Sequence, residues 1–340
     1  MEESVILREG YARLKKTRTV FIGGLLALLV ILIGVAVTLG SAGFTVGESY
    51  LAILAGLFPE TFTAPEMADV IVWDYRLHRV LFAVVAGFGL AVAGSVMQGI
   101  LRNPLASPFT LGISSAAATG ASVAIVLGAG FVGGEYLIIA NAFLFALLAS
   151  VAIYGMARYR GVSSETMILA GIALMYLFSA VTSLLQYVGT AEELQAVVFW
   201  MFGSVGKSTW PKLGLVTLVI ACTVPYLIYR AWDLNALAEG DEVAAGLGVP
   251  VERSMMVFMM VASLITAVII CFTGTIGFIG LVAPHITRMA IGGDYRTLIP
   301  ASGLVGAVLL LAADSVGRSI LAPQVLPVGI VTAFLGVPFF

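Results

Sequence analysis

The sequence predicts an all-α integral membrane protein built from ten transmembrane helices. Of its 340 residues, 60% are hydrophobic and only 11% are charged, and the mean hydropathy is +1.08. Ordinary soluble domains carry roughly a quarter charged residues. A bilayer core about 30 Å thick requires about 20 helical residues, and apolar runs close to that length recur along this chain.

The spans follow one another in a regular order. The first, residues 20–40, is longer than a signal-peptide core of about 7–15 residues, so we expect it to be retained after the N-terminal segment 1–19. Residues 20–340 are then expected to form one ten-helix domain, with an inner loop at 230–253. The remaining spans are predicted at residues 80–101, 112–129, 136–157, 165–188, 212–229, 254–272, 276–290, 298–313 and 326–340.

Basic residues predict the orientation of the chain. With ten spans both termini share one side, and placing them inside puts twelve of the 17 Lys and Arg residues in the inner segments. Basic residues are enriched in cytoplasmic loops. We therefore expect a multi-pass protein of the cytoplasmic membrane with its N-terminus in the cytoplasm. Five cations remain outside: Arg76, Arg79, Lys207, Lys212 and Arg318.

The polar residues inside the spans indicate packing faces and a pathway. In the second span Ala83, Gly87, Ala91, Ser95 and Gly99 repeat at every fourth position, which favours close helix packing. In the fifth span one face carries polar side chains, which favours a pathway lining over helix–helix contact because lipid would not solvate the amide. These residues are Ser179, Thr182, Ser183 and Gln186.

Ionisable residues are missing near the middle of every predicted span. Ion-coupled carriers commonly place such residues there, so an ion-coupled secondary transporter is less favoured. A membrane enzyme would need a cluster of His, Asp or Glu, and the chain has two histidines far apart. We therefore expect no catalytic residue, no cofactor and no metal site. The segment "GSVGKST" resembles a phosphate-binding loop, but Met201 replaces its first glycine.

The inner loop at 230–253 has the pattern of a docking element. Leu234, Leu237 and Leu247 fit one apolar helical face, and Glu239, Asp241 and Glu242 add negative charge. A solvated amphipathic loop is one interpretation. A short helix pair lying in a groove of another protein is the other.

Long motifs resemble those of FecCD-type permease subunits, which belong to ABC importers for vitamin B12, ferric siderophores and haem. They run in family order from "RLHR" to "LPVGIVTAFLGVPFF", through "GSVMQGILRNPLASPFTLGIS", "LNALAEGDEVAAGLGV" and "GTIGFIGLVAPHITRMAIGGDYRTLIPASGLVGAVLLLAADSVGR". The sequence departs from the family at His78, where proline is usual, and at Val325, where glutamate is common. The chain also ends at Phe340, without the usual short tail.

The resemblance implies partners and a transport role. The subunit would form a homodimer with the pathway on its twofold axis, joined by two cytoplasmic ATPase subunits and an outer substrate-binding protein. The implied cargo is an iron chelate, such as a siderophore or haem, with cobalamin or an oxyanion as alternatives. His285, in the shared "VAPHITR" motif, would be structural.

The resemblance also assigns roles to individual residues. Coupling to the ATPase would fall on Leu234, Leu237, Glu239, Asp241, Glu242, Leu247 and Gly248, and the cytoplasmic gate on Ser163 and Ser164. Cations beside a span usually anchor it to lipid headgroups. In the vitamin B12 importer of this family, however, arginines matching Arg76, Arg79 and Arg318 receive glutamates of the binding protein, and the resemblance therefore favours docking.

Overall fold

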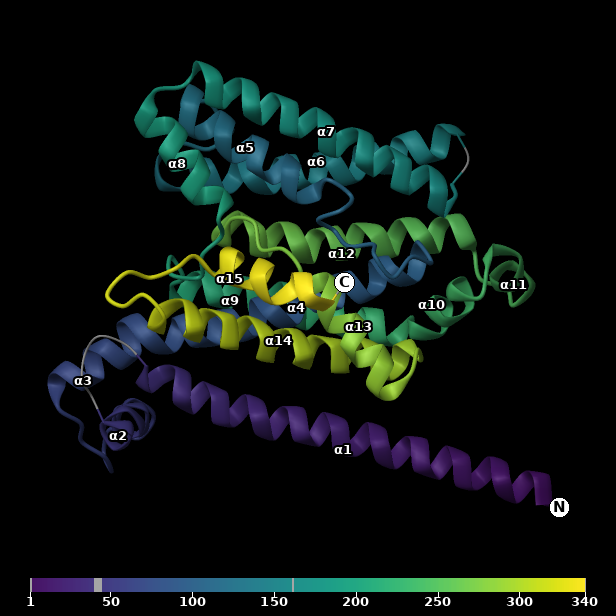
Figure 1. The fold of residues 1–340 in the computed structure, drawn as a ribbon, viewed down its shortest axis with the longest axis horizontal. Coiled ribbons are helices and arrows are strands. Elements are labelled where there is room, and N and C mark those ends of the chain that lie inside the picture. The colour runs from purple at the N-terminus through teal and green to yellow at the C-terminus, as the bar shows by residue number, and fades with distance from the viewer. Residues whose placement is uncertain (1, 40–44, 161, 340) are drawn as a thin grey trace.

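The computed structural model describes residues 2–39, 45–160 and 162–339, and all regular elements in these ranges are helices (Figure 1). This confirms the predicted all-α class. Seven helical segments are long and apolar enough to cross a membrane: Lys15–Thr38, Glu66–Ile100, Gly134–Tyr159, Ser164–Val188, Trp210–Tyr229, Val251–Thr273 and Tyr295–Ser319.

The element order follows the predicted spans closely. Gly40 and Phe340, at the ends of two predicted spans, lie outside the described residues. The α-helices are α1 (Glu2–Thr38), α2 (Val46–Leu57), α3 (Glu66–Ile71), α4 (His78–Ile100), α5 (Ile113–Leu127), α6 (Leu137–Arg160), α7 (Ser164–Val188), α8 (Ala191–Met201), α9 (Trp210–Tyr229), α10 (Ala231–Ala238), α11 (Asp241–Gly246), α12 (Val251–Thr273), α13 (Ile279–Ile291), α14 (Tyr295–Ser319) and α15 (Val328–Gly336). A π-helical turn η1 (Val72–Leu77) joins α3 to α4, and 3₁₀ turns η2 (Gly134–Tyr136) and η3 (Val337–Phe339) flank α6 and α15.

Three predicted spans correspond to short helices. The third, eighth and tenth spans contain α5, α13 and α15, which have 15, 13 and 9 residues. Each is shorter than the ~20 residues that a straight crossing requires. Among the helices that lie where no span was predicted are α2 and α8. Each begins with a capping box, formed by Thr45 with Glu48 and by Thr190 with Glu193.

The helix α4 lies at the centre of the bundle and contacts α9, α12, α13 and α14. Its small-residue stripe is buried along its whole length, which confirms the predicted close packing. A Cβ atom on Gly87 would clash with the carbonyl oxygen of Gly306 in α14, and one on Gly94 would clash with that of Gly280 in α13. Glycine at these positions therefore lets the backbones approach closely.

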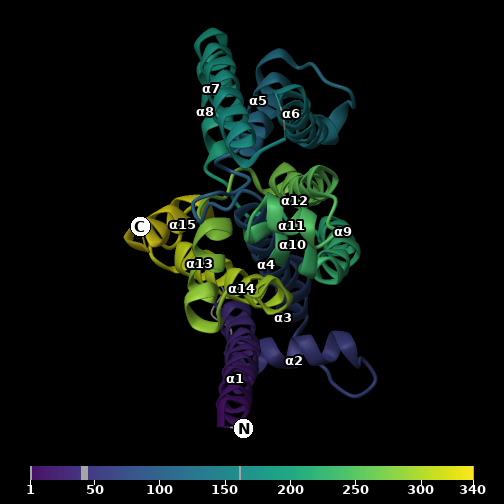
Figure 2. The same ribbon diagram turned by 90° about the vertical axis from the view of Figure 1, so that its right-hand side faces the viewer.

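The helices form layers on either side of α12. Helices α5 to α8 pack together on one side, and α12 contacts both α6 of that layer and α4 of the centre (Figures 1 and 2). On the far side α1 lies against α14 at the edge of the molecule (Figure 2). The long helix α1 is therefore held mainly by one neighbour.

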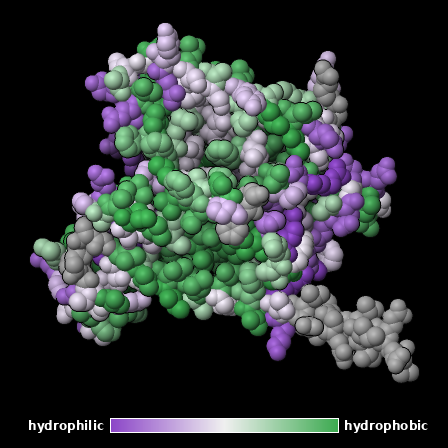
Figure 3. Space-filling view, viewed as in Figure 1, coloured by the Kyte–Doolittle hydropathy of each residue, from purple (hydrophilic) through white to green (hydrophobic). Residues whose placement is uncertain are grey.

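Apolar residues cover the middle of the face shown in Figure 3, and hydrophilic residues gather at its two ends. This distribution matches a bilayer core between two aqueous interfaces, and with the seven apolar helices it makes the chain a multi-pass membrane protein. We call the end that carries Arg76, Arg79 and Arg318 the arginine end. The opposite end, which carries α10 and α11, is the loop end (Figure 1).

Candidate functional site

The three arginines selected from the sequence, Arg76 of η1, Arg79 of α4 and Arg318 of α14, lie together. With residues that include Tyr75 and Val325 they line a cavity of about 500 Å³ at the arginine end. We refer to the three as the arginine cluster. Lysines 207 and 212, the other predicted outer cations, do not line this cavity.

Two members of the arginine cluster bind the end of α1. Arg76 donates from Nη1 to the carbonyl oxygens of Val37 and Thr38, each at 3.1 Å. Arg318 donates to the carbonyls of Leu39 and Ala36, at 2.9 and 3.0 Å. The last carbonyls of a helix have no partner within the helix, and cations are favourable beside them. Both side chains therefore have a structural role as C-terminal caps, which the sequence did not reveal.

A buried aspartate completes the arginine cluster. Asp314 is 2% exposed, and its carboxylate forms ion pairs with Arg79 at 2.8 Å and with Arg318 at 3.0 Å. The ninth span was predicted to end at residue 313, but α14 continues to Ser319, so Asp314 lies inside a helix. Three cations against one anion leave the cavity positively charged. Docking of an acidic partner there stays a prediction.

The predicted coupling loop forms two short helices, α10 and α11, at the loop end. Leu234 and Leu237 are fully buried against their own chain, so the expectation that they face a partner is wrong. An amphipathic helix needs an apolar surface to cover it, and here the bundle itself supplies that surface. Leu247 is 70% exposed and remains available. Glu239, Glu242 and Gly248 are also exposed, and Asp241 is half-buried.

The gate residues lie at the start of α7. Ser163 is its N-cap and accepts a hydrogen bond from the Thr166 amide at 3.2 Å. Ser164 is buried and donates to the carbonyl of Ile100 at 3.1 Å, which ties α7 to the end of α4.

Arg102 joins the predicted gate to the predicted coupling loop. Its guanidinium donates to Ser164 Oγ at 3.2 Å and pairs with both carboxylate oxygens of Asp241 at 3.1 and 3.2 Å. Its backbone has a φ of 48°, a strained region for a residue with a side chain. Sequence reasoning missed Arg102, because nothing in the local pattern indicates which distant residues it contacts.

The polar stripe of α7 does not share one environment. Thr182 is buried, and its hydroxyl bonds with that of Thr119 in α5 at 2.8 Å. Ser179 and Ser183 are exposed, although Ser183 donates back to the Ser179 carbonyl at 3.0 Å. Gln186 is half-buried, with its amide 3.7 Å from the Met201 sulfur. The pathway prediction therefore rests on Ser179 and Ser183, and Thr182 serves helix packing instead.

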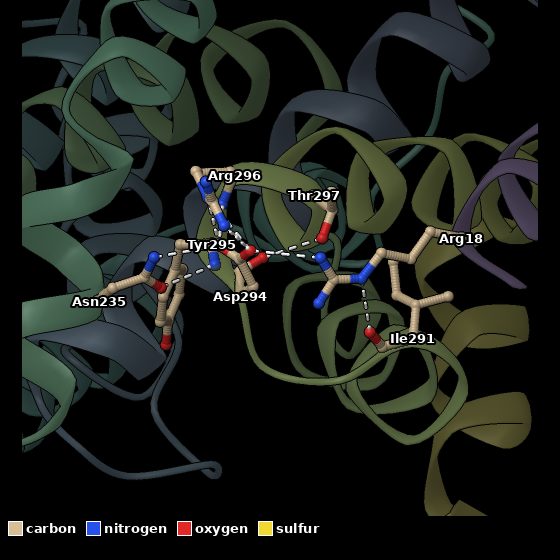
Figure 4. A network of polar contacts seen from close by, with 7 residues as sticks. All are labelled: Arg18, Asn235, Ile291, Asp294, Tyr295, Arg296 and Thr297. Atoms are coloured by element: carbon tan, nitrogen blue, oxygen red, sulfur yellow. Dashed lines mark hydrogen bonds and ion pairs between the residues drawn. The ribbon is translucent and has the colours of Figure 1, made fainter. Parts of the chain in front are cut away.

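A second network at the loop end was not predicted (Figure 4). Asp294, the N-cap of α14, receives hydrogen bonds from Arg296, from Asn235 of α10 at 3.0 Å and from Arg18 of α1 at 3.3 Å. The hydrogen bonds from Arg296, together with that from Asn235, hold the pKa of Asp294 well below its usual range. Asn235 also accepts from the Tyr295 amide at 2.9 Å. The Gly-Gly-Asp sequence before an apolar run is the signal that could have revealed this cap.

The described ranges contain no cluster of side chains suited to bind a metal ion. Among these residues no group of three or more His, Cys, Asp or Glu side chains is placed to hold an ion. Cys222 is exposed and Cys271 is buried, and neither forms a disulfide.

The chain is similar to known proteins of one transport family. The profile of the FecCD transport family matches residues 26–340. The cobalamin import system permease BtuC of Halobacterium salinarum is 39% identical over 83% of this chain and 75% of its own length. The hemin transport system permease HmuU of Yersinia pestis is 38% identical over 94% of this chain and 93% of its own. Other similar proteins are named for siderophore and molybdate transport.

A solved structure also resembles the whole chain. It is an inward-facing conformation of a transporter described as of the metal-chelate ABC type. The two share 31% sequence identity with a TM-score of 0.82, covering 94% of this chain and 96% of the other.

Proposed function

Because the chain belongs to the FecCD transport family of ABC-importer permeases, we propose that it forms the membrane pathway for an iron chelate, either a siderophore or haem. The family works with separate ATPase and binding-protein partners, so ATP hydrolysis belongs to other subunits. The observation that carries the choice of cargo is the whole-chain similarity to a metal-chelate type transporter. Cobalamin and an oxyanion are the alternatives, since similar proteins are named for cobalamin and molybdate.

The contacts within the chain support different roles for its two ends. The loop end would be cytoplasmic, and the exposed Leu247 with the acidic residues Glu239 and Glu242 would contact the ATPase. Arg102 would carry movement of Asp241 to the gate at Ser164, through bonds of 3.1 to 3.2 Å. The positively charged cavity at the arginine end would receive acidic side chains of the binding protein.

The whole domain, residues 20–340, would act as a homodimer in this scheme. The exposed side of α7, with Ser179 and Ser183, would face the twofold axis. Exposed polar groups in a membrane helix need water or protein around them rather than lipid, and a position at the twofold axis would provide this.

Reconstitution tests the cargo. Proteoliposomes containing this permease, its ATPase and its binding protein are given a ferric siderophore, haem, cobalamin or molybdate. We expect ATP-dependent, vanadate-sensitive uptake of an iron chelate only. Uptake of cobalamin or molybdate in its place would contradict the proposed cargo, and uptake without ATP would contradict the importer mechanism.

Two matched substitutions test the coupling surface in the same system. Leu247→Asp places a charge where an apolar contact is proposed, and we expect the ATPase no longer to copurify. Leu321→Asp is the control, because Leu321 is 52% exposed but follows α14 at the arginine end. Equal ATPase recovery with both variants would show that Leu247 does not contact the ATPase.

A further inference from the structure

A groove of about 700 Å³ lies between α1 and the start of α14 at the loop end. It includes none of the residues to which the proposed function assigns a role. Among the described residues that line it, six come from α1, two from α14, and one is the N-cap of α14: Lys15, Arg18, Thr19, Ile22, Gly23, Leu26, Arg296, Thr297 and Asp294.

The α1 residues of the groove occupy a single helix face. Their positions advance by alternating steps of three and one, from residue 15 to residue 26, so they lie one above another. The face begins with two cations, Lys15 and Arg18, and becomes apolar at Ile22 and Leu26. At a rise of 1.5 Å per residue this stretch is about 16 Å long, close to one half of a bilayer core about 30 Å thick.

The groove has room along its apolar part. A Cβ atom added to Gly23 would meet nothing within 4 Å. Leu26 is 48% exposed, so its side chain is not covered by the bundle. An alkyl chain could therefore lie along Gly23 and Leu26 without displacing protein atoms.

Positive charge exceeds negative charge at the mouth of the groove. Asp294 is the only acidic residue among the described residues that line it, and its carboxylate already accepts hydrogen bonds from Arg18, Arg296 and Asn235 (Figure 4). Lys15 forms no ion pair with any residue in the described ranges. Three cations facing one anion leave the mouth with a surplus of positive charge.

We propose that this groove binds one phospholipid with a net negative headgroup. The phosphate would lie among Lys15, Arg18 and Arg296, and one acyl chain would follow Ile22, Gly23 and Leu26. Guanidinium and ammonium groups are strong phosphate donors, and basic pockets between membrane helices suit anionic headgroups. A cationic mouth followed by an apolar face at membrane depth matches an amphiphile better than a soluble anion.

The site is in direct contact with α10. Asp294 accepts from Asn235 of that helix, and the Arg296 guanidinium lies 4.1 Å from the centre of the Trp232 ring. A bound lipid would therefore hold Arg296 and Asp294 in place beside α10. This consequence rests on the proposed coupling role of the loop end, whereas lipid binding itself does not.

Native mass spectrometry of the purified full-length permease tests the proposal with phosphatidylglycerol as the probe. We expect one tightly bound phosphatidylglycerol per chain, and weaker binding of phosphatidylcholine, which has the same phosphate but no net charge. Lys15→Gln should weaken phosphatidylglycerol binding about fivefold, the effect of about one surface cation. Lys16→Gln is the matched control, because Lys16 is exposed on the same helix but does not line the groove.

Three results would overturn the proposal. The first is equal binding of the two lipids, and the second is the same affinity loss in both lysine variants or in neither. The third is displacement of the lipid by an equal concentration of inorganic phosphate, which would identify a site for a free anion. Since the measurement uses the permease alone, any of these would leave the import function untouched.

Discussion

Arg79 differs from its two neighbours in what it binds. Arg76 and Arg318 each donate to two carbonyls at the end of α1, whereas the hydrogen bonds of Arg79 go to Asp314. Asp314 would keep Arg318 as a partner if Arg79 were removed. Arg79 is therefore the member of the cluster whose charge can be removed with the least effect on folding.

The first prediction uses this difference to test docking. In Arg79→Gln we expect the affinity of nanodisc-embedded permease for its binding protein to fall, with a weaker dependence on salt, because one steering charge is lost. Thermal stability should change little. Arg318→Gln should instead lower the free energy of unfolding by roughly 3 kcal/mol, because it leaves the carbonyls of Ala36 and Leu39 uncapped as well as removing an ion pair of the buried Asp314. Unchanged affinity and salt dependence in Arg79→Gln would leave the cluster with its capping role alone.

Single residues show where sequence reasoning reached its limit. The charges at the span ends were found, because a cation beside an apolar run stands out. Their partners were not, because Asp314 lies beyond the predicted end of a span and the carbonyls of residues 36–39 lie 38 to 282 positions away along the chain. The position of a charge is a local property, but its partner depends on the fold.

At the scale of elements, Arg102 links α11 to α7 at the loop end, because its guanidinium contacts both Asp241 and Ser164. In Arg102→Gln we expect the permease–ATPase complex to hydrolyse ATP while uptake per ATP falls several-fold, because the link between Asp241 and Ser164 is lost. The ion pair is partly exposed, so the free energy of unfolding should change by less than about 1 kcal/mol. Uptake per ATP is the measurement.

Two further variants sharpen this second prediction. Exchanging the charges, with Arg102→Asp and Asp241→Arg together, should restore part of the coupling, and Asp tolerates the positive φ at residue 102 better than most residues. Arg253→Gln is the control, since Arg253 is an exposed arginine at the start of α12. The link is disproved if Arg102→Gln and Arg253→Gln transport equally well.

The elements themselves were predictable to different degrees. Long apolar runs revealed the seven long helices, because an uninterrupted run of about 20 apolar residues is typical of a membrane span and rare in soluble domains. The helices α2 and α8 were missed although their capping boxes, Thr45–Glu48 and Thr190–Glu193, are visible in the sequence. The apolar face of α10 was recognised, but its pattern does not say whether a partner or the chain itself covers Leu234 and Leu237.

For the whole molecule, the third prediction concerns the proposed dimer. Ser183 is exposed on α7 and Thr182, one residue earlier, is buried. In a Cys222→Ser background, which removes the exposed native thiol, Ser183→Cys should give a covalent dimer with a short bifunctional maleimide. Thr182→Cys should not, because its side chain points into its own chain. A crosslink-free Ser183→Cys protein that is also monomeric in detergent by light scattering would rule out this dimer.

The attachments of α1 have a consequence for biogenesis. This helix leaves the ribosome long before its partners in α14, because its hydrogen bonds with Asp294 and Arg318 join residues 276 to 282 positions apart. The carbonyls of Ala36 and Leu39 therefore gain Arg318 as a donor only after α14 has been inserted, whereas Arg76 can bind the carbonyls of Val37 and Thr38 much earlier. The contact between α1 and α14 therefore forms late, so a nascent chain arrested before α14 should keep this face of α1 accessible to membrane proteases and quality control.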